Sequence, residues 1–316
     1  SALRWLLITL FIAAGSFLLT SFIAPVTAQA KTLAEPTGTV ISQDITTDTT
    51  WAKAGGPYTV TQFVRVRPNV KLTVEAGTEI AFQEHASLRV EGTLVALGTA
   101  NAPILFTGTA KEPGAWNGIT AGNTAEQPAS LTFDHVIVEY AIYVGMENNA
   151  NLTLDHTVAT IRNSTFRLSG GNGLNVSGNA TATIADSAFV NNTLEALRIT
   201  YGAQRVPTMS NLTAGGNGTL NGVVFASGRI ASDITLTQMG LPYIFKGGFD
   251  VEKEGHVTLA PGLEVQVDTG FYVRGTLTAV GTAAQPILLT GINQMPGGWW
   301  GLAIGRTAAH RPDLVW

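Results

Sequence analysis

Two short motifs that end in Asp-His are the first candidates for chemistry in this sequence. LTFDH ends at Asp134-His135, and LTLDH ends at Asp155-His156. A carboxylate beside an imidazole can bind a metal ion or move a proton, so one hypothesis is a stacked pair of Asp-His sites. Adjacent residues of a strand point to opposite faces of a sheet, however, and we expect the two side chains of each motif to diverge.

Related segments carry other polar residues at the place of these motifs. TIRNSTF has Arg162-Asn163 there, and TIADSAF has Ala185-Asp186. A position that accepts such different residues is typical of a polar turn at the end of a strand. We therefore favour a turn, and we predict no catalytic, cofactor-binding or metal-binding site in the sequence.

The remaining acidic residues and histidines are scattered along the chain. Hydrolysis of a sugar chain needs two carboxylates at a set separation, and the sequence has no Asp-Asp pair. A fold that stacks distant segments can still bring such groups together, so an enzyme stays open as the alternative. The scattered groups are His85, Glu139, Glu147, Glu195, Asp233, Asp250, His256, Asp268 and His310.

Three tryptophans offer flat surfaces on which a sugar ring can stack. Trp116, Trp299 and Trp300 each follow a Pro-Gly turn and come directly before an expected strand. This placement favours packing over the edge of a core, and we expect a structural role for them.

Seven Asn-x-Ser/Thr triplets would be glycosylation acceptors in a eukaryotic secretory route. Asn also tolerates left-handed backbone dihedrals and bonds to the backbone, so we expect these residues to lie in turns. The triplets begin at Asn151, Asn163, Asn175, Asn179, Asn191, Asn211 and Asn217.

Composition describes a chain of short strands and tight turns. The 316 residues include 13% charged residues, 35 Gly and no Cys, and the net charge is −4. Low charge with many apolar residues argues against disorder. Without a basic block we expect no nucleic-acid partner. The lack of Cys excludes disulfides and thiolate metal sites, but it does not exclude export.

The segment 1–30 has the features of a secretory signal. Arg4 precedes an apolar run over 5–23, and Ala28-Gln29-Ala30 is a small-residue cleavage pattern. We predict cleavage after Ala30 and export to the cell surface or the extracellular space. The run is long for a signal, so an uncleaved membrane anchor is the alternative, and it would be the chain's only membrane contact. Because the chain starts at Ser1 and stops at Trp316 without a polar tail, we expect it to be a truncated fragment.

A duplicated stretch organises the rest of the chain. GTLVALGTANAPILFTG (92–108) returns as GTLTAVGTAAQPILLTG (275–291) with 12 of 17 positions identical, and it contains no His or carboxylate. The duplication extends to one module over about 57–122 and a second over about 242–305, with a looser repeat region over 123–241 between them. Residues 31–56 are expected to be an extended lead-in.

Inside the modules, apolar residues alternate with polar ones, as in short strands with one buried face. Leu94 and Ile104 should point inward. Val74, Val90 and Phe106 follow one another at an even spacing that is short for a coil of three strands. This even spacing suggests stacked coils narrower than those of the middle region.

Two series of segments repeat in the middle region. One is GITA, AIYV, GLNV, ALRI and GVVF, and ANLTLDHTV stands outside it as an expected insert. The other is TFDHVIV, TIRNSTF, TIADSAF and TMSNLTA, which begin at Thr132, Thr160, Thr183 and Thr208. A coil of roughly 20–25 residues buries its apolar face only against the coils above and below, so its pattern must recur.

These segments resemble the right-handed parallel β-helix of secreted bacterial repeat proteins. The resemblance is carried by LTVEAGTEIAF, LRVEGTLVALGTANAPILFTG and PGAWNGI, with the looser TIRNSTF and TIADSAF units, and it covers about residues 50–305. It implies an all-β fold with the β-helix over 57–316. The architecture hosts lyases, hydrolases, adhesins and scaffolds, so it implies no single function.

Pectin-hydrolase-like proteins of this architecture would show Asp-Asp, Gly-His-Gly and Arg-Ile-Lys, whereas this chain has GHV from Gly255 and Arg198-Ile199-Thr200. We therefore expect a non-catalytic secreted or cell-surface scaffold for adhesion, spacing or polymer binding. Its expected partner is an extracellular polysaccharide or cell-surface polymer, and no cofactor is expected. A secreted polysaccharide lyase or glycoside hydrolase on the same fold is the alternative.

Overall fold

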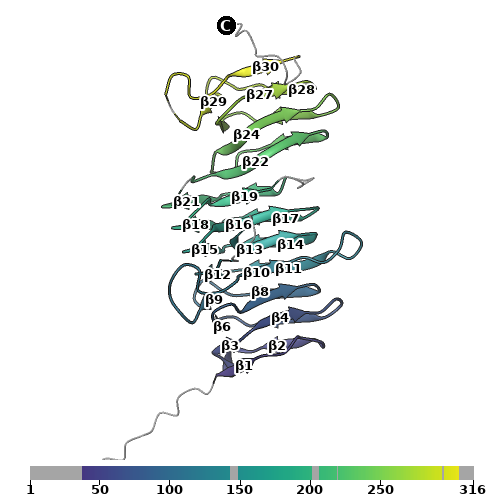
Figure 1. Cartoon of the computed structure of the whole chain (residues 1–316), viewed down its shortest axis with the longest axis vertical. Coiled ribbons are helices and arrows are strands. Elements are labelled where there is room, and N and C mark those ends of the chain that lie inside the picture. The colour runs from purple at the N-terminus through teal and green to yellow at the C-terminus, as the bar shows by residue number, and fades with distance from the viewer. Residues whose placement is uncertain (1–37, 143–148, 201–205, 219, 294, 306–316) are drawn as a thin grey trace, which may run out of the picture. The chain divides into compact units, whose positions relative to one another are not determined.

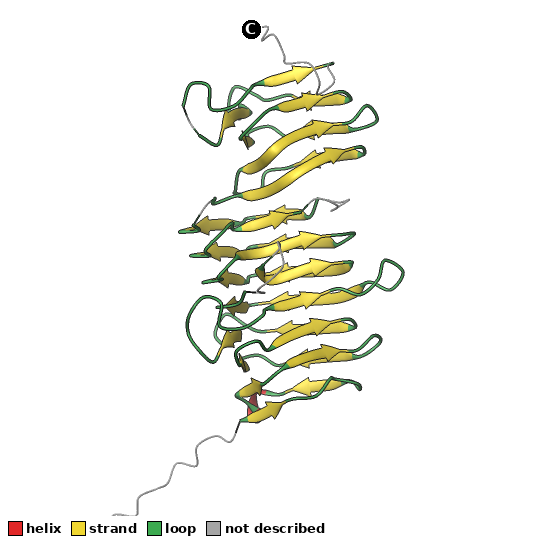
Figure 2. Ribbon diagram, in the orientation of Figure 1, coloured by secondary structure: helices red, strands yellow, loops and turns green. Residues whose placement is uncertain are grey.

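The structure is a computed structural model that describes residues 38–142, 149–200, 206–218, 220–293 and 295–305. Over these ranges the chain forms short strands and one 3-10 helix, η1 (Lys53–Gly55). The strands stack as about ten coils of a parallel β-helix (Figures 1 and 2). The predicted all-β, parallel β-helix architecture is confirmed.

Three long sheets follow the stack, and a small fourth sheet accompanies its C-terminal part. Sheet A contains β1 (Thr39–Ile41), β3 (Tyr58–Val60), β6 (Glu79–Phe82), β9 (Ile104–Gly108), β12 (Val136–Glu139), β15 (Thr165–Arg167), β18 (Ala188–Val190) and β21 (Thr213–Gly215). Sheet C contains β2 (Thr49–Trp51), β5 (Lys71–Val74), β8 (Thr93–Leu97), β11 (Ala129–Asp134), β14 (Thr157–Arg162), β17 (Thr181–Ala185) and β20 (Thr208–Ser210).

Sheet B is the longest and continues into the C-terminal coils. Its strands are β4 (Phe63–Val66), β7 (Ser87–Val90), β10 (Ile119–Ala121), β13 (Ala150–Asp155), β16 (Asn172–Ser177), β19 (Leu197–Ile199), β22 (Val223–Ile230), β24 (Tyr243–Val251), β26 (Glu264–Val267), β27 (Phe271–Val273), β29 (Leu288–Gly291) and β30 (Leu302–Ile304). Sheet D contains β23 (Asp233–Leu236), β25 (His256–Leu259) and β28 (Thr276–Ala279).

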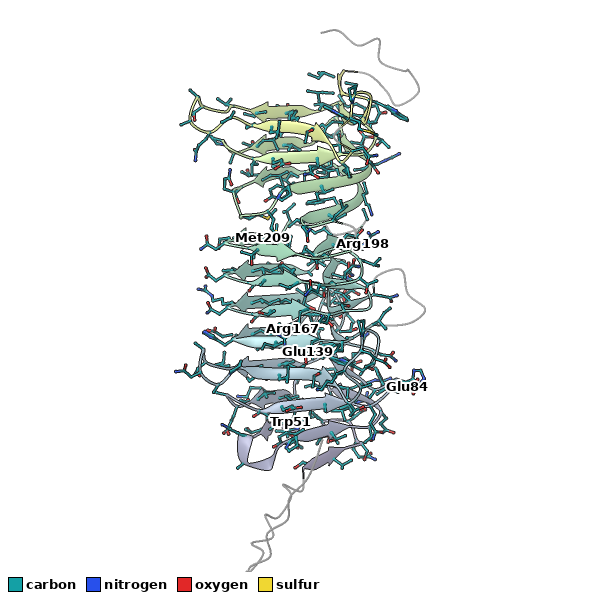
Figure 3. The ribbon with its side chains drawn as sticks, turned by 90° about the vertical axis from the view of Figure 1, so that its left-hand side faces the viewer. Trp51, Glu84, Glu139, Arg167, Arg198 and Met209 are labelled. Carbon is teal, nitrogen blue, oxygen red and sulfur yellow. The ribbon has the colours of Figure 1, made fainter. Side chains whose placement is uncertain are left out.

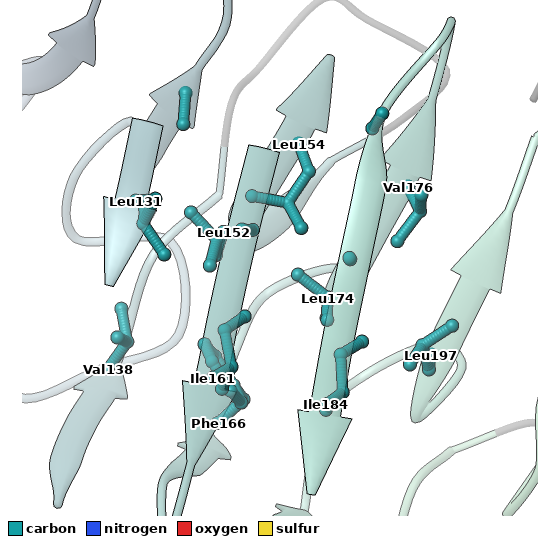
Figure 4. Close-up of a cluster of buried hydrophobic side chains, with 14 of the residues drawn as sticks. Leu131, Val138, Leu152, Leu154, Ile161, Phe166, Leu174, Val176, Ile184 and Leu197 are labelled. Atoms are coloured by element: carbon teal, nitrogen blue, oxygen red, sulfur yellow. The ribbon is translucent and has the colours of Figure 1, made fainter. Parts of the chain in front are cut away.

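The core lies between the sheets and is filled by alternate residues of each strand (Figure 4). Leu94 and Ile104 are fully buried, as predicted. Aromatic rings continue from one coil to the next, as where Phe166 and Phe189 stack with their ring centroids 5.5 Å apart. Each inward side chain is therefore covered mainly by its counterparts in the neighbouring coils.

One of the two predicted repeat series gives the register of sheet C. Thr132 of β11 pairs with Thr160 of β14, Thr160 pairs with Thr183 of β17, and Thr183 pairs with Thr208 of β20. These four threonines begin the segments that were aligned on sequence alone, and that alignment is confirmed.

The other series contains one wrong member. GITA, GLNV, ALRI and GVVF supply β10, β16, β19 and β22 of sheet B, but AIYV does not supply the strand between the first two. That strand is β13, in which Leu152 pairs with Ile119 on one side and Leu174 on the other. The segment expected to be an insert is thus a regular part of the coil, while Ala141 makes only an isolated bridge to Trp116.

The even spacing of Val74, Val90 and Phe106 does not describe the coils of the first module. These residues belong to three different sheets, C, B and A. The residue stacked on Val74 is Ala96, and the residue stacked on Phe106 is Ile80. The first module is therefore as wide as the middle region. All three strands of a coil share the same alternation, so a spacing between strands was mistaken for a spacing between coils.

The N-terminal boundary of the stack lies earlier than expected. β1 pairs with β3 and β2 pairs with β5, so residues 39–51 form a coil inside the segment that was expected to be a lead-in. The predicted signal or anchor over 1–30 lies outside the described residues. Within the described ranges, no helix has the length and apolarity needed to cross a membrane.

The duplicated modules place equivalent strands in equivalent order, with one difference. β5 to β10 of the first module correspond to β25 to β30 of the second. The first module has separate strands β3 and β4, whereas the second has the single long strand β24. Gly247 and Gly248, with φ of 79° and 91°, bend β24 so that it pairs with both β26 and β27.

Leu94→Ala tests the core assignment. It should lower the free energy of unfolding by about 2–5 kcal/mol, because it empties a buried aliphatic site. Leu97 ends the same strand and is 50% exposed, so Leu97→Ala should change it by less than about 0.5 kcal/mol. Denaturant unfolding combined with hydrogen exchange measures both, since a repeat array need not unfold in one step. Equal costs would contradict the inward assignment of Leu94.

Candidate functional site

The outward face of sheet B carries a row of side chains suited to ligand binding. In β7, Leu88 and Val90 are buried and face the core, so Arg89 between them points outward. The strand register carries this position from coil to coil. The resulting outward row is Arg65, Arg89, Thr120, Thr153, Asn175, Arg198, Val224, Ile244 and Gln266.

Two arginines lie side by side at the N-terminal end of the outward row. Arg65 and Arg89 are register partners on β4 and β7, so their backbones are about 4.8 Å apart. Arg89 Nε donates to Glu91 Oε1 at 3.2 Å. Arg65 Nε is buried without a hydrogen-bond partner in the described residues, and the guanidinium lies 4.9 Å from the ring of the exposed Phe63. Like charges on neighbouring strands repel, so this pair is suited to a negatively charged ligand.

Asn175 of β16 lies in the middle of the outward row and is fully buried. Among the residues that the structure describes, neither its amide nitrogen nor its amide oxygen has a hydrogen-bond partner, and the adjacent Arg198 Nε is also buried and unpartnered. Buried polar atoms without partners are rare in folded proteins. Because these atoms are enclosed by the protein, they are not exposed to a ligand outside the stack.

A buried carboxylate lies beside the C-terminal part of the row. Glu195 is 3% exposed and contacts Arg198 Nη1 at 3.3 Å and Lys246 Nζ at 2.9 Å. Lys246 belongs to β24, two strands beyond β19, so the ion pair passes across β22, where the outward Val224 is fully buried. The Glu195 carboxylate is therefore paired with two cationic side chains.

A second buried carboxylate lies on sheet A. Glu139, at the end of β12, accepts hydrogen bonds from Thr107 Oγ1 at 2.9 Å and from Arg167 Nε at 2.7 Å. Figure 3 shows Glu139 and Arg167 close to one another, with Arg198 nearer the C-terminal end of the stack. Both buried glutamates thus have cationic partners within the fold.

The expectation that the Asp-His motifs diverge is wrong. His135 Nδ1 lies 2.7 Å from Asp134 Oδ1, and His156 Nδ1 lies 2.8 Å from Asp155 Oδ1. Both histidines have positive φ, 49° and 47°, so the strand has ended and its alternation no longer applies. The two motifs do not stack on one another, because Asp134 ends β11 of sheet C whereas Asp155 ends β13 of sheet B.

His135 belongs to a column of turn residues between sheets C and A. The equivalent residues of the next coils, Asn163, Asp186 and Asn211, have φ of 48°, 50° and 50°. Asn163 Nδ2 donates to Asp134 Oδ1 at 2.8 Å, and Asn211 Nδ2 donates to Asp186 Oδ1 at 2.9 Å. The left-handed turn alone accounts for His, Asn and Asp at these positions.

The other histidines form isolated contacts. His256 was expected to stand alone, but its Nδ1 lies 2.8 Å from Asp233 Oδ1. His85 Nε2 lies 3.5 Å from Glu84, with both side chains largely exposed. His310 and Glu147 lie outside the described residues.

The two remaining aspartates are also apart from one another. Asp250 pairs with Arg274, which contacts Glu252 at 3.1 Å as well. Asp268 accepts the Gly247 N–H at 2.8 Å. Across the described ranges, no group of three or more His, Asp or Glu side chains is placed to hold a metal ion.

The three tryptophans differ in exposure. Trp116 is fully buried, its ring stacks on Phe82 at 4.0 Å, and its Nε1 donates to the Glu139 carbonyl at 2.9 Å. Trp299 is partly buried against the core. Trp300 is 62% exposed, so of these three indoles it alone offers a large part of its surface to solvent.

The asparagines of the Asn-x-Ser/Thr triplets divide into two sets. Asn163, Asn179, Asn191 and Asn211 are exposed, and three of them have positive φ as expected of turn residues. Asn151, Asn175 and Asn217 are buried instead. Asn151 shows why, since its Nδ2 donates to the backbone carbonyls of Val138 and Arg167 at 3.0 and 2.9 Å and thereby links two coils.

Among the described residues, three titratable groups have clearly shifted pKa values. Burial raises the pKa of Tyr243, and the hydrogen bond to Asp250 raises the pKa of Arg274. Hydrogen bonds from its own backbone and from Thr124 lower the pKa of the exposed Glu126. A general acid for glycoside hydrolysis needs a raised carboxyl pKa, and none of these three shifts supplies one.

The outward row was not found from the sequence, although a signal was present. The third residue of GITA, GLNV and ALRI is Thr120, Asn175 and Arg198, respectively, and each is flanked by two buried apolar residues. Aligning those segments by their polar residues would have predicted this part of the row. The wrong placement of AIYV hid Thr153, the member that belongs to β13.

A family model described as a pectate-lyase like beta helix domain matches residues 43–152. The match spans the coils from β2 to β13 and includes Arg65, Arg89 and Thr120 of the outward row. No curated protein and no solved structure matches the chain. The family match and the stacked parallel strands together characterise the architecture, and neither assigns an activity.

His135→Val and His135→Asn test the role of the Asp-His motif. A β-branched residue at φ of 49° should cost about 1–2 kcal/mol of unfolding free energy. His135→Asn places there the residue found at the equivalent Asn163, and it should change stability by less than about 0.5 kcal/mol. Chemical denaturation measures both. A large cost for His135→Asn would indicate that the imidazole itself is required.

Proposed function

We propose that this parallel β-helix repeat protein is a non-catalytic extracellular or cell-surface scaffold that binds an acidic polysaccharide along the outward row of sheet B. The observation that carries the proposal is the adjacent pair Arg65 and Arg89, of which only Arg89 has a carboxylate partner, Glu91, for its side chain within the described residues. A polymer with a carboxylate on successive sugars offers negative charges at the close spacing that this pair requires.

Polar groups continue the row beyond the two arginines. Thr120 follows Arg89, and Asn175 follows two strands later, with successive strands about 4.8 Å apart. The hydroxyl groups of a sugar chain can donate to and accept from the hydroxyl of Thr120, which is partly exposed, whereas the Asn175 amide is buried and out of reach. Cations together with neutral polar groups fit an acidic polysaccharide better than a neutral one.

The enzymatic alternative needs a group that exchanges protons with the substrate. Glu195 is a buried carboxylate beside the row, and it is occupied by Arg198 and Lys246. The match to a pectate-lyase-like domain supports the fold and leaves a lyase or hydrolase as the outcome that activity assays must exclude.

Arg65→Gln combined with Arg89→Gln should weaken binding of polygalacturonate about tenfold or more, because a hydrogen bond to a charged group contributes roughly 1.5–3 kcal/mol. Arg162→Gln is the matched control, since it removes an exposed cation from β14 of sheet C. Isothermal titration calorimetry with polygalacturonate and with neutral dextran measures both variants. An equal loss of affinity for Arg162→Gln would mean that net charge alone drives binding. It would contradict the proposal that the outward row of sheet B is the binding face.

The unmodified chain should release no unsaturated or reducing ends from polygalacturonate, alginate or dextran, with or without calcium. Release of such ends by the chain, abolished by Glu195→Gln, would replace the scaffold with a lyase or hydrolase. Binding without cleavage, sensitive to the Arg65 and Arg89 substitutions, is the outcome that supports the proposal.

A further inference from the structure

The outward side of sheet C carries a row of threonines in register. In β14, Ala159 and Ile161 are buried and face the core, so Thr160 between them points outward. The strand register carries this position from coil to coil, and every member except Val95 is a threonine. The row consists of Thr50, Thr73, Val95, Thr132, Thr160, Thr183 and Thr208.

Four consecutive strands in the middle of sheet C carry a second outward row beside the first. These strands are β8, β11, β14 and β17, which lie next to one another in the stack (Figure 1). Their register runs through both rows without a bulge. The two rows form a grid of uncharged side chains, none of them buried, which we call the threonine face. It consists of Thr93, Val95, Ser130, Thr132, Val158, Thr160, Thr181 and Thr183.

The hydroxyl groups of the threonine face are available to solvent. Among the described residues, none of its threonines and not Ser130 makes a side-chain hydrogen bond within the protein. The neighbouring Thr157 is different, because its side chain is buried and its hydroxyl donates to the Ala121 carbonyl. The grid therefore presents methyl groups together with hydroxyls that can bond to water.

Both repeats of the threonine face are set by the backbone. Successive strands lie about 4.8 Å apart, and residues two apart on one strand lie roughly 6.6 Å apart. Water molecules on a prism face of hexagonal ice recur at similar distances in two perpendicular directions. A regular array with these repeats can hold its hydration water in positions that continue the crystal.

The threonine face also differs in charge from the other outward surfaces. β-branched residues are favoured on strands in general, but the outward row of sheet B mixes Arg65, Asn175 and Gln266 with aliphatic residues. In sheet C, charged residues stand only beside the grid, with Lys71 on β5 and Arg162 at the end of β14. An uncharged array complements an uncharged ligand such as crystalline water.

Sheet D has a matching threonine row without a neutral second row. There the second row contains Asp233 and His256, whose side chains lie 2.8 Å apart. Within the described sheets, the neutral grid is thus confined to β8, β11, β14 and β17. The threonine row of sheet D is Thr235, Thr258 and Thr278.

We propose that the threonine face binds the surface of ice. Its methyl groups and hydroxyls order a layer of water whose repeats match those of the crystal, and this layer joins the protein to the ice. The inference is independent of the proposed function, because the acidic polysaccharide is assigned to sheet B and is measured by a different assay.

Thr160→Lys tests the proposal in the full chain. It should lower the share of the protein that enters a slowly grown ice hemisphere about tenfold, because a charged side chain against the crystal loses its water and is left unpaired. Thr183→Lys should have the same effect. Thr165→Lys is the matched control, since it adds the same charge at a partly exposed position of β15 in sheet A, and it should enter the ice like the unmodified chain.

The gap between the melting and freezing temperatures of a single ice crystal is the second measurement, and it should shrink in the same two variants. Circular dichroism and polygalacturonate binding show that each variant is folded, and both should stay constant.

Three results would overturn the proposal. The first is exclusion of the unmodified chain from the ice to the same extent as serum albumin. The second is an equal share in the ice for Thr160→Lys, Thr183→Lys and Thr165→Lys. The third is a loss of ice binding on dilution together with larger species in sedimentation, which would mean that the threonine face pairs with a second copy of the chain.

Discussion

Each coil of this protein is stable because the coils above and below cover its apolar face. One turn of three short strands cannot enclose a core, so its inward residues are buried only when the pattern recurs in the next turn. Phe166 over Phe189 illustrates this, since the aromatic ring of one coil is the partner of the ring in the next. The same constraint accounts for the duplication, in which the inward apolar positions recur, whereas the outward Arg65 and Arg89 are replaced by Asp250 and Tyr272.

The corners of the coils impose a second constraint. A chain that leaves one sheet and enters the next within one or two residues needs a left-handed conformation, and His135, Asn163, Asp186 and Asn211 adopt it in successive coils. Residues that suggest a chemical site are therefore selected here for their backbone preference and for the hydrogen bonds they make to the neighbouring coil. The buried side chain of Asn151 also connects neighbouring coils, because it donates hydrogen bonds to backbone carbonyls of two of them.

The architecture could be predicted from the sequence because two features are visible without knowledge of long-range contacts. One is the alternation of apolar and polar residues within each strand, and the other is the recurrence of that pattern along the chain. The threonine series was placed in the correct register, since its members share both apolar and polar positions. The assignment of strands to sheets failed at Val74, Val90 and Phe106, because strands of all three sheets alternate in the same way. The polar turn at His135 was expected from the sequence, but the Asp-His contact was not, because it depends on the left-handed backbone of His135, which ends the alternation of the strand. The unpartnered amide of Asn175 depends on burial, which only the assembled stack determines.

The spacing of the coils sets a length scale for any ligand of sheet B. Arg65 and Arg198 stand five strands apart in the outward row, which places them roughly 24 Å from one another at about 4.8 Å per strand. A short oligosaccharide can reach one of these cations but not both, whereas a longer chain engages the two at once. Because the second contact is then intramolecular, affinity should rise steeply once the polymer exceeds that length. Under the proposed function, the stack would therefore select its ligand by length as well as by charge.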